Sequence, residues 1–260
     1  MNLYFNTSLA NGYHSPSQRI RLLTEDWVYN NMFCPRCGNK KLEQLSNNKP
    51  VADFICPHCS NQYELKSKAG EFGKKIADGA YSTMISRITS NTNPDFFFLN
   101  YCPDIQKVYS FIIVPRHFII PSIIEKRKPL SAHAQRAGWT SCNIILSEIP
   151  IQGRIFVINH EIEKSKKSII DKLNFTRTFE ANDIETRGWL FDILNCVNLI
   201  SSNEFNLEEI YRFETFLSIK HPENYNIQPK IRQQLQLLRD KGYIEFLGGG
   251  RYKKTILCKE

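Results

Sequence analysis

The chain has 260 residues, 42% of them hydrophobic, and a formal net charge of +8. That length accommodates two domains or one large domain, and the apolar share is sufficient for a packed core. The sequence contains no run of about eighteen apolar residues, and its first residues lack the basic and apolar regions of a signal peptide. We therefore expect a cytoplasmic protein without a membrane span, and the excess of basic residues weakly favours a polyanionic partner.

A helix is predicted after the turn at residues 15–17, because apolar side chains such as Leu23 and Trp27 follow at helical spacing. Glu25 and Asp26 lie on this helix, shortly before the metal-binding segments described next. A solvated helix face is the favoured interpretation of both carboxylates, and a role in metal binding is the alternative.

Two Cys-x-x-Cys motifs follow, with eighteen residues between them, and their cysteines are Cys34, Cys37, Cys56 and Cys59. Each motif offers two thiolates to one ion, and four thiolates leave no open coordination position, so the sequence predicts a structural zinc site. In a reducing compartment such paired motifs indicate a metal more often than disulfides. The remaining cysteines are interpreted as small buried hydrophobic residues: Cys102, Cys142, Cys196 and Cys258.

Two strand-like runs, 51–55 and 62–66, carry the residues of a second candidate metal site. Asp53 lies in the first run, and the two-residue period of a strand puts Glu64 and Lys66 of the second run on one face. Carboxylate oxygens suit Mg²⁺, and a lysine beside the ion can stabilise the charge that develops during phosphodiester hydrolysis. Asp53 and Glu64 are therefore candidate magnesium ligands, and Lys66 is the candidate electrophilic helper.

The spacing of these three residues is common by chance, and alone it would favour two surface strands with solvated charges. Support comes from the surrounding zinc motifs and from a basic stretch suited to phosphates, which contains Lys68, Lys74, Lys75 and Arg87. The combination favours a metal-dependent nuclease site.

The centre of the chain has the alternation of helices and strands that is typical of an α/β core. The predicted elements are a helix over 76–90, apolar strands over 95–101 and 108–114, irregular chain with a short helix over 115–129, and a last strand over 153–158. The two apolar strands are of the kind that is buried on both faces of a sheet.

A basic loop runs from residue 127 to Trp139 and contains Arg136. A tryptophan at the end of such a loop can contact a nucleic-acid base, or it can be half-buried and anchor the loop. The residues alone leave these two interpretations equally open.

A change of pattern places the domain boundary near residue 180, with domains at 1–180 and 181–260. The second domain has a helix over 188–200, a helix opened by a capping box at 206–209, and a helix opened by Pro229. A hairpin with a glycine tip follows. Three helices and a basic hairpin predict a winged helix, whose third helix enters the DNA major groove.

The outward side chains of the third helix and the hairpin are the candidate DNA contacts of this domain. They are Lys230, Arg232, Gln233 and Gln236 on the helix, and Arg251 and Lys253 on the hairpin. Glutamine suits the edge of adenine, and the basic side chains suit phosphates. Winged helices also mediate protein contacts, which is the alternative for this domain.

Over essentially its whole length the sequence resembles the DpnI-like, methyl-directed Type II (subtype IIM) restriction endonucleases. The segments that carry the resemblance are 23–29, 50–54, 64–68, 93–98, 136–139 and 230–241. The resemblance implies a PD-(D/E)xK catalytic domain of α/β (α+β) class with a four-cysteine zinc-ribbon element, followed by a winged helix. It also implies cleavage of double-stranded DNA at GATC sites that contain N6-methyladenine.

Carried over by position, the resemblance implies that Asp53, Glu64 and Lys66 are catalytic, that Mg²⁺ is the catalytic ion, and that the four motif cysteines hold zinc. It further implies that Trp139 contacts the methyl groups. Ala52 stands where the general nuclease motif has proline, a position that varies in that superfamily.

Two other functions fit parts of the same pattern. A transcriptional regulator would bind DNA through a zinc ribbon and a winged helix without cutting it, but it has no need for a carboxylate and a lysine on one strand face beside Asp53. A repair or junction nuclease would cut DNA without regard to methylation. A monomer is expected, because no heptad repeat or exposed apolar stripe stands out.

Overall fold

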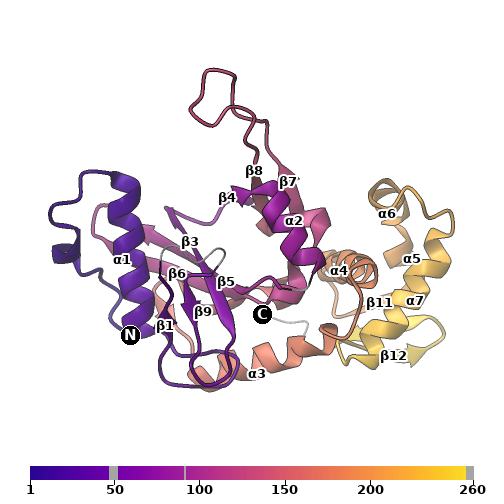
Figure 1. The fold of residues 1–260 in the computed structure, drawn as a ribbon. Coiled ribbons are helices and arrows are strands. Elements are labelled where there is room, and N and C mark those ends of the chain that lie inside the picture. The colour runs from indigo at the N-terminus through magenta and orange to yellow at the C-terminus, as the bar shows by residue number, and fades with distance from the viewer. Residues whose placement is uncertain (47–51, 91, 256–260) are drawn as a thin grey trace. The chain divides into compact units, whose positions relative to one another are not determined.

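The computed structural model describes residues 1–46, 52–90 and 92–255, and it divides into two compact units (Figure 1). The N-terminal unit contains residues 1–147 and 153–177, and the C-terminal unit contains residues 148–152 and the chain from 178 onward. Among the described residues, no helix is both long and apolar enough to cross a membrane. Residue 51 of the predicted first strand and Cys258 lie outside the described residues.

A seven-stranded mixed sheet forms the centre of the N-terminal unit, in the order β1-β2-β3-β5-β6-β9-β10. Its strands are β1 (Glu43–Gln44), β2 (Phe54–Ile55), β3 (Gln62–Ala69), β5 (Asp95–Cys102), β6 (Lys107–Val114), β9 (Ile155–Asn159) and β10 (Ile162–Glu163). β3 pairs with β5 in parallel, and the other neighbouring pairs of this sheet are antiparallel. The two strand-like runs predicted around Asp53 and Glu64 thus contain β2 and β3, which pair with each other.

Two helices, α1 (Pro16–Asn31) and α3 (Lys166–Thr176), contribute to one hydrophobic core with this sheet. Trp27 of α1 meets Phe111 of β6 edge-on, with ring centroids 5.6 Å apart. Tyr63 of β3 stacks on Phe97 of β5 at 4.5 Å. Each such side chain contributes roughly 1.5–3 kcal/mol when it is fully buried. This packing fixes β3, the strand that carries Glu64.

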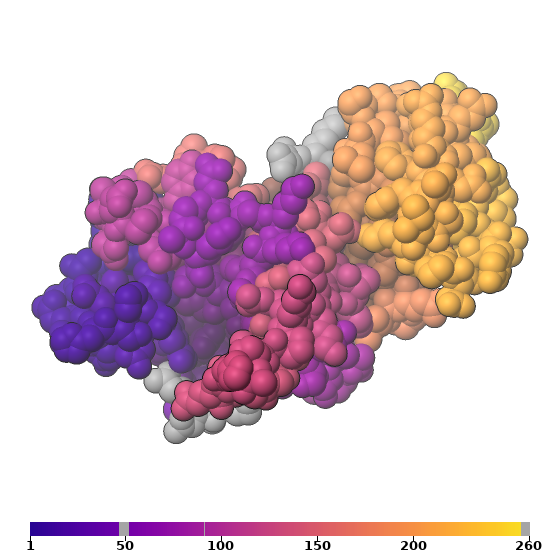
Figure 2. All heavy atoms as spheres, turned by 90° about the horizontal axis from the view of Figure 1, so that it is seen from above, coloured from indigo at the N-terminus to yellow at the C-terminus, as the bar shows by residue number. Residues whose placement is uncertain are grey.

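A second, three-stranded sheet in the same unit has the order β4-β8-β7, with antiparallel neighbours. Its strands are β4 (Lys75–Ala80), β7 (Ile124–Lys126) and β8 (Ser141–Ile145), and α2 (Tyr81–Thr89) follows β4 directly. The basic loop 127–140 joins β7 to β8 and extends beyond their ends (Figure 1). In the space-filling view this loop stands at the surface of the unit (Figure 2).

Three predictions for this unit need correction. The helix predicted over 76–90 is wrong at its start, because residues 75–80 form β4 and the helix begins only at Tyr81. Asp78 and Gly79 are poor helix formers, and Ile76 is buried between exposed neighbours as in an edge strand. The segment 115–129 contains two 3₁₀ turns and also β7. The strand predicted as the last of the domain is β9, and the two-residue β10 follows it.

The described part of the C-terminal unit contains four α-helices and a three-stranded sheet of order β11-β13-β12. The elements are α4 (Ile184–Leu199), β11 (Glu204–Asn206), α5 (Leu207–Tyr211), α6 (Glu214–Lys220), α7 (Ile227–Asp240), β12 (Ile244–Gly248) and β13 (Arg251–Lys254). The predicted capping box is confirmed at Asn206 and Glu209. The hairpin with its glycine tip is also confirmed, whereas α6 was not predicted.

The last long helix, α7, packs on its unit through a stripe of three fully buried residues, Ile231, Leu235 and Leu238. The helix begins two residues before Pro229, so this proline lies in the first turn, where its missing N–H costs no hydrogen bond. Gly242 follows the helix with a φ of +80°, a conformation that favours glycine.

Candidate active site

The four cysteines of the two motifs meet at one point. Their sulfur atoms all lie within 4.8 Å of one another, and the Cys34–Cys59 and Cys37–Cys56 sulfur pairs are each 3.6 Å apart. A tetrahedral zinc ion with Zn–S bonds of about 2.3 Å requires sulfurs about 3.8 Å apart, so the donor set fits zinc in both chemistry and spacing. The four thiols could therefore bind a zinc ion.

The two motifs have the same backbone geometry. The amide of Gly38 donates to the carbonyl of Cys34 at 2.8 Å, and the amide of Ser60 donates to the carbonyl of Cys56 at 2.9 Å. Gly38 and Ser60 both have positive φ, at +76° and +57°. Each turn thus brings its two thiols to the same side, which is the requirement for a shared ion.

The zinc site is joined to the sheet through Tyr63. The Tyr63 hydroxyl lies 3.1 Å from the sulfur of Cys34, and the Tyr63 carbonyl accepts the amide hydrogen of Asp53 at 2.9 Å. Tyr63 is fully buried and immediately precedes Glu64 on β3. One residue therefore connects the four-cysteine site to β3 through its side chain and to Asp53 through its backbone.

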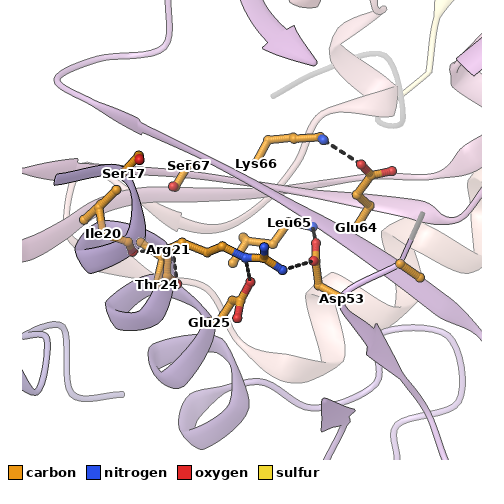
Figure 3. Close-up of a pocket in the computed structure, with 11 residues that line it drawn as sticks. Ser17, Ile20, Arg21, Thr24, Glu25, Asp53, Glu64, Leu65, Lys66 and Ser67 are labelled. Carbon is orange, nitrogen blue, oxygen red and sulfur yellow. Dashed lines mark hydrogen bonds and ion pairs between the residues drawn. The ribbon is translucent and has the colours of Figure 1, made fainter. Parts of the chain in front are cut away.

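A pocket of about 380 Å³ contains Asp53, Glu64 and Lys66 together (Figure 3). It lies between α1 and β3, and its lining residues are Ser17, Ile20, Arg21, Thr24, Glu25, Ala52, Asp53, Glu64, Leu65, Lys66 and Ser67. The pocket is thus mostly polar and carries several opposed charges.

Asp53 is held at the rim of this pocket by backbone geometry. It lies directly before β2, and its Oδ2 accepts the amide hydrogen of Leu65 at 2.7 Å. Its other oxygen, Oδ1, lies 3.7 Å from the guanidinium of Arg21. One oxygen is therefore used in positioning, and the other is turned toward the charged groups of the pocket (Figure 3).

Glu64 and Lys66 lie on the same face of β3, as the two-residue period predicts, and their charged atoms are 2.5 Å apart. Burial raises the pKa of Glu64 to about 7; Lys66 opposes this shift and the carboxylate of Asp78 adds to it. Burial acts to lower the pKa of Lys66, but Glu64 and Asp78 outweigh burial and raise it.

The second oxygen of Glu64, Oε2, is buried and has no hydrogen-bond partner among the described residues. A buried carboxylate oxygen without a partner is costly, and a bound cation removes this cost. Asp53 and Glu64 both line this pocket, and carboxylate oxygens are the kind of ligand that Mg²⁺ prefers.

Asp78 is a charged neighbour that the sequence did not identify. It lies on β4, its side chain is only 3% exposed, and its carboxylate forms an ion pair with the ammonium of Lys66. The predicted helix over 76–90 gave no indication that Asp78 would reach Lys66.

Glu25 is also buried, at 6% exposure, so the predicted solvated face is wrong for this residue. It accepts a hydrogen bond from Arg21 at 2.5 Å and another from Gln44 of β1 at 2.8 Å. These partners stabilise its burial, and they place it on the pocket wall beside Asp53. Asp26 is partly exposed and accepts a hydrogen bond from Asn30 at 2.9 Å.

The basic loop presents its two candidate residues together. The guanidinium of Arg136 lies over the ring of Trp139, 4.5 Å from its centroid, and Trp139 is half-buried. The backbone of Trp139 is bonded to Leu130 and Arg136, and the bond to Leu130 joins the two ends of the loop near its base. Two of the basic residues after β3 already have partners within the protein, since Lys75 pairs with Glu125 and Arg87 donates to the Thr92 carbonyl at 2.6 Å.

In the C-terminal unit the predicted outward face of α7 is exposed at Arg232, Gln233 and Gln236, while Lys230 is half-buried. A hollow of about 450 Å³ lies at the start of this helix, lined by Glu223, Asn224, Tyr225, Asn226, Pro229, Lys230 and Gln233. On the hairpin Arg251 is exposed, whereas Lys253 is half-buried and faces Glu204 and Glu245 across the strands. Gln233, Gln236 and Arg251 are therefore the most accessible to a partner, whereas Arg232 donates a hydrogen bond to the Tyr211 hydroxyl at 2.7 Å.

Comparison with protein families assigns both parts of the chain. Residues 1–182 match the DpnI model, described as the Dam-replacing family, and residues 185–254 match the DpnI_C model, described as the Dam-replacing HTH domain. The helix-turn-helix match indicates DNA binding by the C-terminal unit. The first match alone covers more than half of the sequence, so the chain belongs to the DpnI, or Dam-replacing, family of methylation-dependent restriction endonucleases.

Proposed function

We propose that the protein cleaves double-stranded DNA at GATC sites containing N6-methyladenine, by Mg²⁺-dependent hydrolysis of a phosphodiester bond in each strand. The observation that carries this proposal is the convergence of Asp53, Glu64 and Lys66 in one pocket of a domain that matches a restriction endonuclease family. The N-terminal unit would act as a PD-(D/E)xK nuclease with a four-cysteine zinc ribbon, and the C-terminal unit as a winged helix.

The pocket residues have distinct roles in this reaction. Asp53 and Glu64 would hold Mg²⁺, which when bound supplies Lewis-acid polarisation of the phosphoryl oxygens. The ammonium of Lys66 stabilises the negative charge that develops as water attacks the phosphorus and the P–O ester bond breaks. The products are a phosphate monoester and an alcohol. Arg21 holds one oxygen of Asp53 toward the pocket.

The charges of the site support a divalent ion. Four carboxylates lie in or beside the pocket, at Asp53, Glu64, Asp78 and Glu25, and the cations Arg21, Lys66 and Arg87 accompany them. When all are ionised, one negative charge remains without compensation. A bound Mg²⁺ would offset this charge and would also give the buried Oε2 of Glu64 a partner.

Two reading elements would supply the methyl specificity. An apolar surface distinguishes one methyl group by only about 1–3 kcal/mol, or roughly 10–200-fold. The exposed loop with Trp139 would contact the methyl groups from the N-terminal unit, and the exposed face of α7 would contact base edges from the C-terminal unit. A palindromic site carries two methyl groups, so contacts to both from both units multiply the preference.

The test is a digest of one plasmid, prepared with and without adenine methylation at GATC, in Mg²⁺ and moderate salt. Cleavage of the methylated form alone into discrete fragments is the expected result. Cleavage of both forms would reject methyl reading and favour a nuclease of the repair type. Binding of both forms without cleavage would favour a transcriptional regulator.

Asp53→Asn gives a sharper version of this test. The amide can keep the oxygen that accepts from the Leu65 amide but loses the charge needed to hold Mg²⁺. We expect cleavage to fall by at least about 100-fold while binding to methylated duplex is kept. Asp104→Asn, in the exposed turn after β5, is the matched control and should cut like the wild type.

A further inference from the structure

The ammonium of Lys66 lies between two carboxylates that come from different sheets. Glu64 reaches it from the same strand, β3, at 2.5 Å. Asp78 reaches it from β4, which belongs to the three-stranded sheet. Glu64 has a proposed role in holding Mg²⁺, whereas the role of Asp78 is not yet accounted for.

Asp78 is held rigidly in its strand. The backbone amide of Gly79 donates to Asp78 Oδ1 at 2.6 Å, the same oxygen that pairs with Lys66. β4 has an irregularity between Asp78 and Ala80, where its register against β8 shifts. Such bulges re-aim a side chain and occur often beside active sites. The backbone therefore presents the carboxylate to Lys66 in a fixed direction.

The demands on Glu64 explain why a second carboxylate is needed. A divalent ion bound to Glu64 attracts this carboxylate and repels the neighbouring ammonium of Lys66. Glu64 alone would then hold Lys66 weakly at the stage when the lysine must meet the phosphate. Asp78 faces the ammonium from the other sheet and keeps its attraction when Glu64 is occupied.

We propose that Asp78 is a positioning residue, which holds the ammonium of Lys66 in place while Glu64 binds the catalytic cation. This inference rests on the proposed nuclease activity, and it assigns a function to a residue outside the Asp53, Glu64 and Lys66 set. Asp78 acts through Lys66 and does not itself touch the DNA. Its removal should therefore slow the chemical step and leave DNA binding unchanged.

The first experiment compares full-length wild type with Asp78→Asn, which keeps the side-chain shape and removes the charge. The measured quantity is the single-turnover cleavage rate of a methylated GATC duplex in Mg²⁺, with enzyme in excess. We expect a rate about 10–100-fold lower, which is less than the roughly 100–1,000-fold loss for removal of a group that stabilises the transition state directly, because Asp78 acts through Lys66. The dissociation constant for the same duplex, measured in Ca²⁺, should stay within about twofold, because the DNA contacts are intact.

Glu161→Gln is the matched control, because Glu161 also forms an ion pair with a lysine, Lys107, but lies outside the pocket. It should cleave at the wild-type rate. If Asp78→Asn does not fold, Asp78→Ser is measured with the same expectations. Thermal unfolding of each variant is recorded, because a purely structural role for Asp78 would lower the melting temperature and the DNA affinity along with the rate.

A double mutant separates action through Lys66 from a general effect. In a Lys66→Met background, adding Asp78→Asn should change the residual rate by less than about threefold, because coupled residues are not additive. The proposal would be overturned if Asp78→Asn lowered the rate equally in the wild-type and Lys66→Met backgrounds. It would also be overturned if the single Asp78→Asn variant cut within about threefold of the wild-type rate, or if its affinity for DNA fell in parallel with its rate. If wild type itself fails to cut, the proposed function fails instead, so the two failures are distinguishable.

Discussion

Loss of the zinc site should destabilise the N-terminal unit, and Cys37→Ser tests this most cleanly. Cys37 is the exposed member of the four cysteines, so its replacement removes a thiolate and little buried apolar surface. Any large effect of this variant therefore reports on metal binding. Cys102→Ser is the matched control, because Cys102 is half-buried and lies outside the cluster.

The size of the effect follows from the binding energy of structural zinc. Apparent values of about 10–16 kcal/mol shared among four ligands give roughly 3 kcal/mol for one thiolate. For a unit of this size, each kcal/mol corresponds to about 2–4 °C in melting temperature. We therefore expect Cys37→Ser to melt about 10 °C below Cys102→Ser and to contain less than one zinc ion per chain.

The assay combines metal analysis of the purified protein with thermal unfolding, in the presence and absence of a chelator. Chelator should lower the melting temperature of wild type and have little effect on Cys37→Ser. If Cys37→Ser retains one zinc ion and melts within about 2 °C of Cys102→Ser, the four thiols do not form the zinc site inferred from their spacing.

Two further predictions concern packing and methyl reading. Gly153→Ala should destabilise the N-terminal unit by about 1–3 kcal/mol, because its new Cβ would meet the ring of buried Phe118 at 2.6 Å. Denaturant unfolding measures this loss of stability, and Gly79→Ala, whose Cβ would have open space, should show no such loss. An equal loss of stability in both variants would refute the clash. Trp139→Ala should reduce the ratio of the cleavage rates on methylated and unmethylated GATC by about 10–200-fold. His133→Ala, in the same loop, should preserve this ratio. An unchanged ratio for Trp139→Ala would exclude contact between Trp139 and the methyl groups.

The central strands β5 and β6 could be predicted because their sequences are strongly apolar and their burial is nearly complete. The strands of the smaller sheet could not. β4 contains alanine, glycine and aspartate without a β-branched run, and β7 has only three residues. Such short strands exist because of their partners in the fold, which a local pattern does not contain.

The same limit explains which residues of the site were missed. Asp53 directly precedes β2, and Glu64 and Lys66 lie on β3, the next strand in sequence, so these three residues could be identified from short neighbouring segments. Asp78 reaches Lys66 from a different sheet, and Glu25 is buried only because Arg21 and the two-residue strand β1 supply its partners. These contacts depend on tertiary structure, and the sequence carried no separate signal for them.

The position of the four-cysteine site beside the candidate active-site pocket has a physical reason. β2 contains only two residues, too few to hold Asp53 in place by strand pairing alone. Cys56 directly follows β2, and Tyr63 of β3 contacts Cys34. A bound zinc ion would therefore restrain both β2 and β3. Thiolates select zinc and carboxylates select magnesium, so the two sites can lie side by side and bind different ions. Chelation of zinc should therefore slow cleavage even with Mg²⁺ in excess, because Asp53 would lose its fixed position.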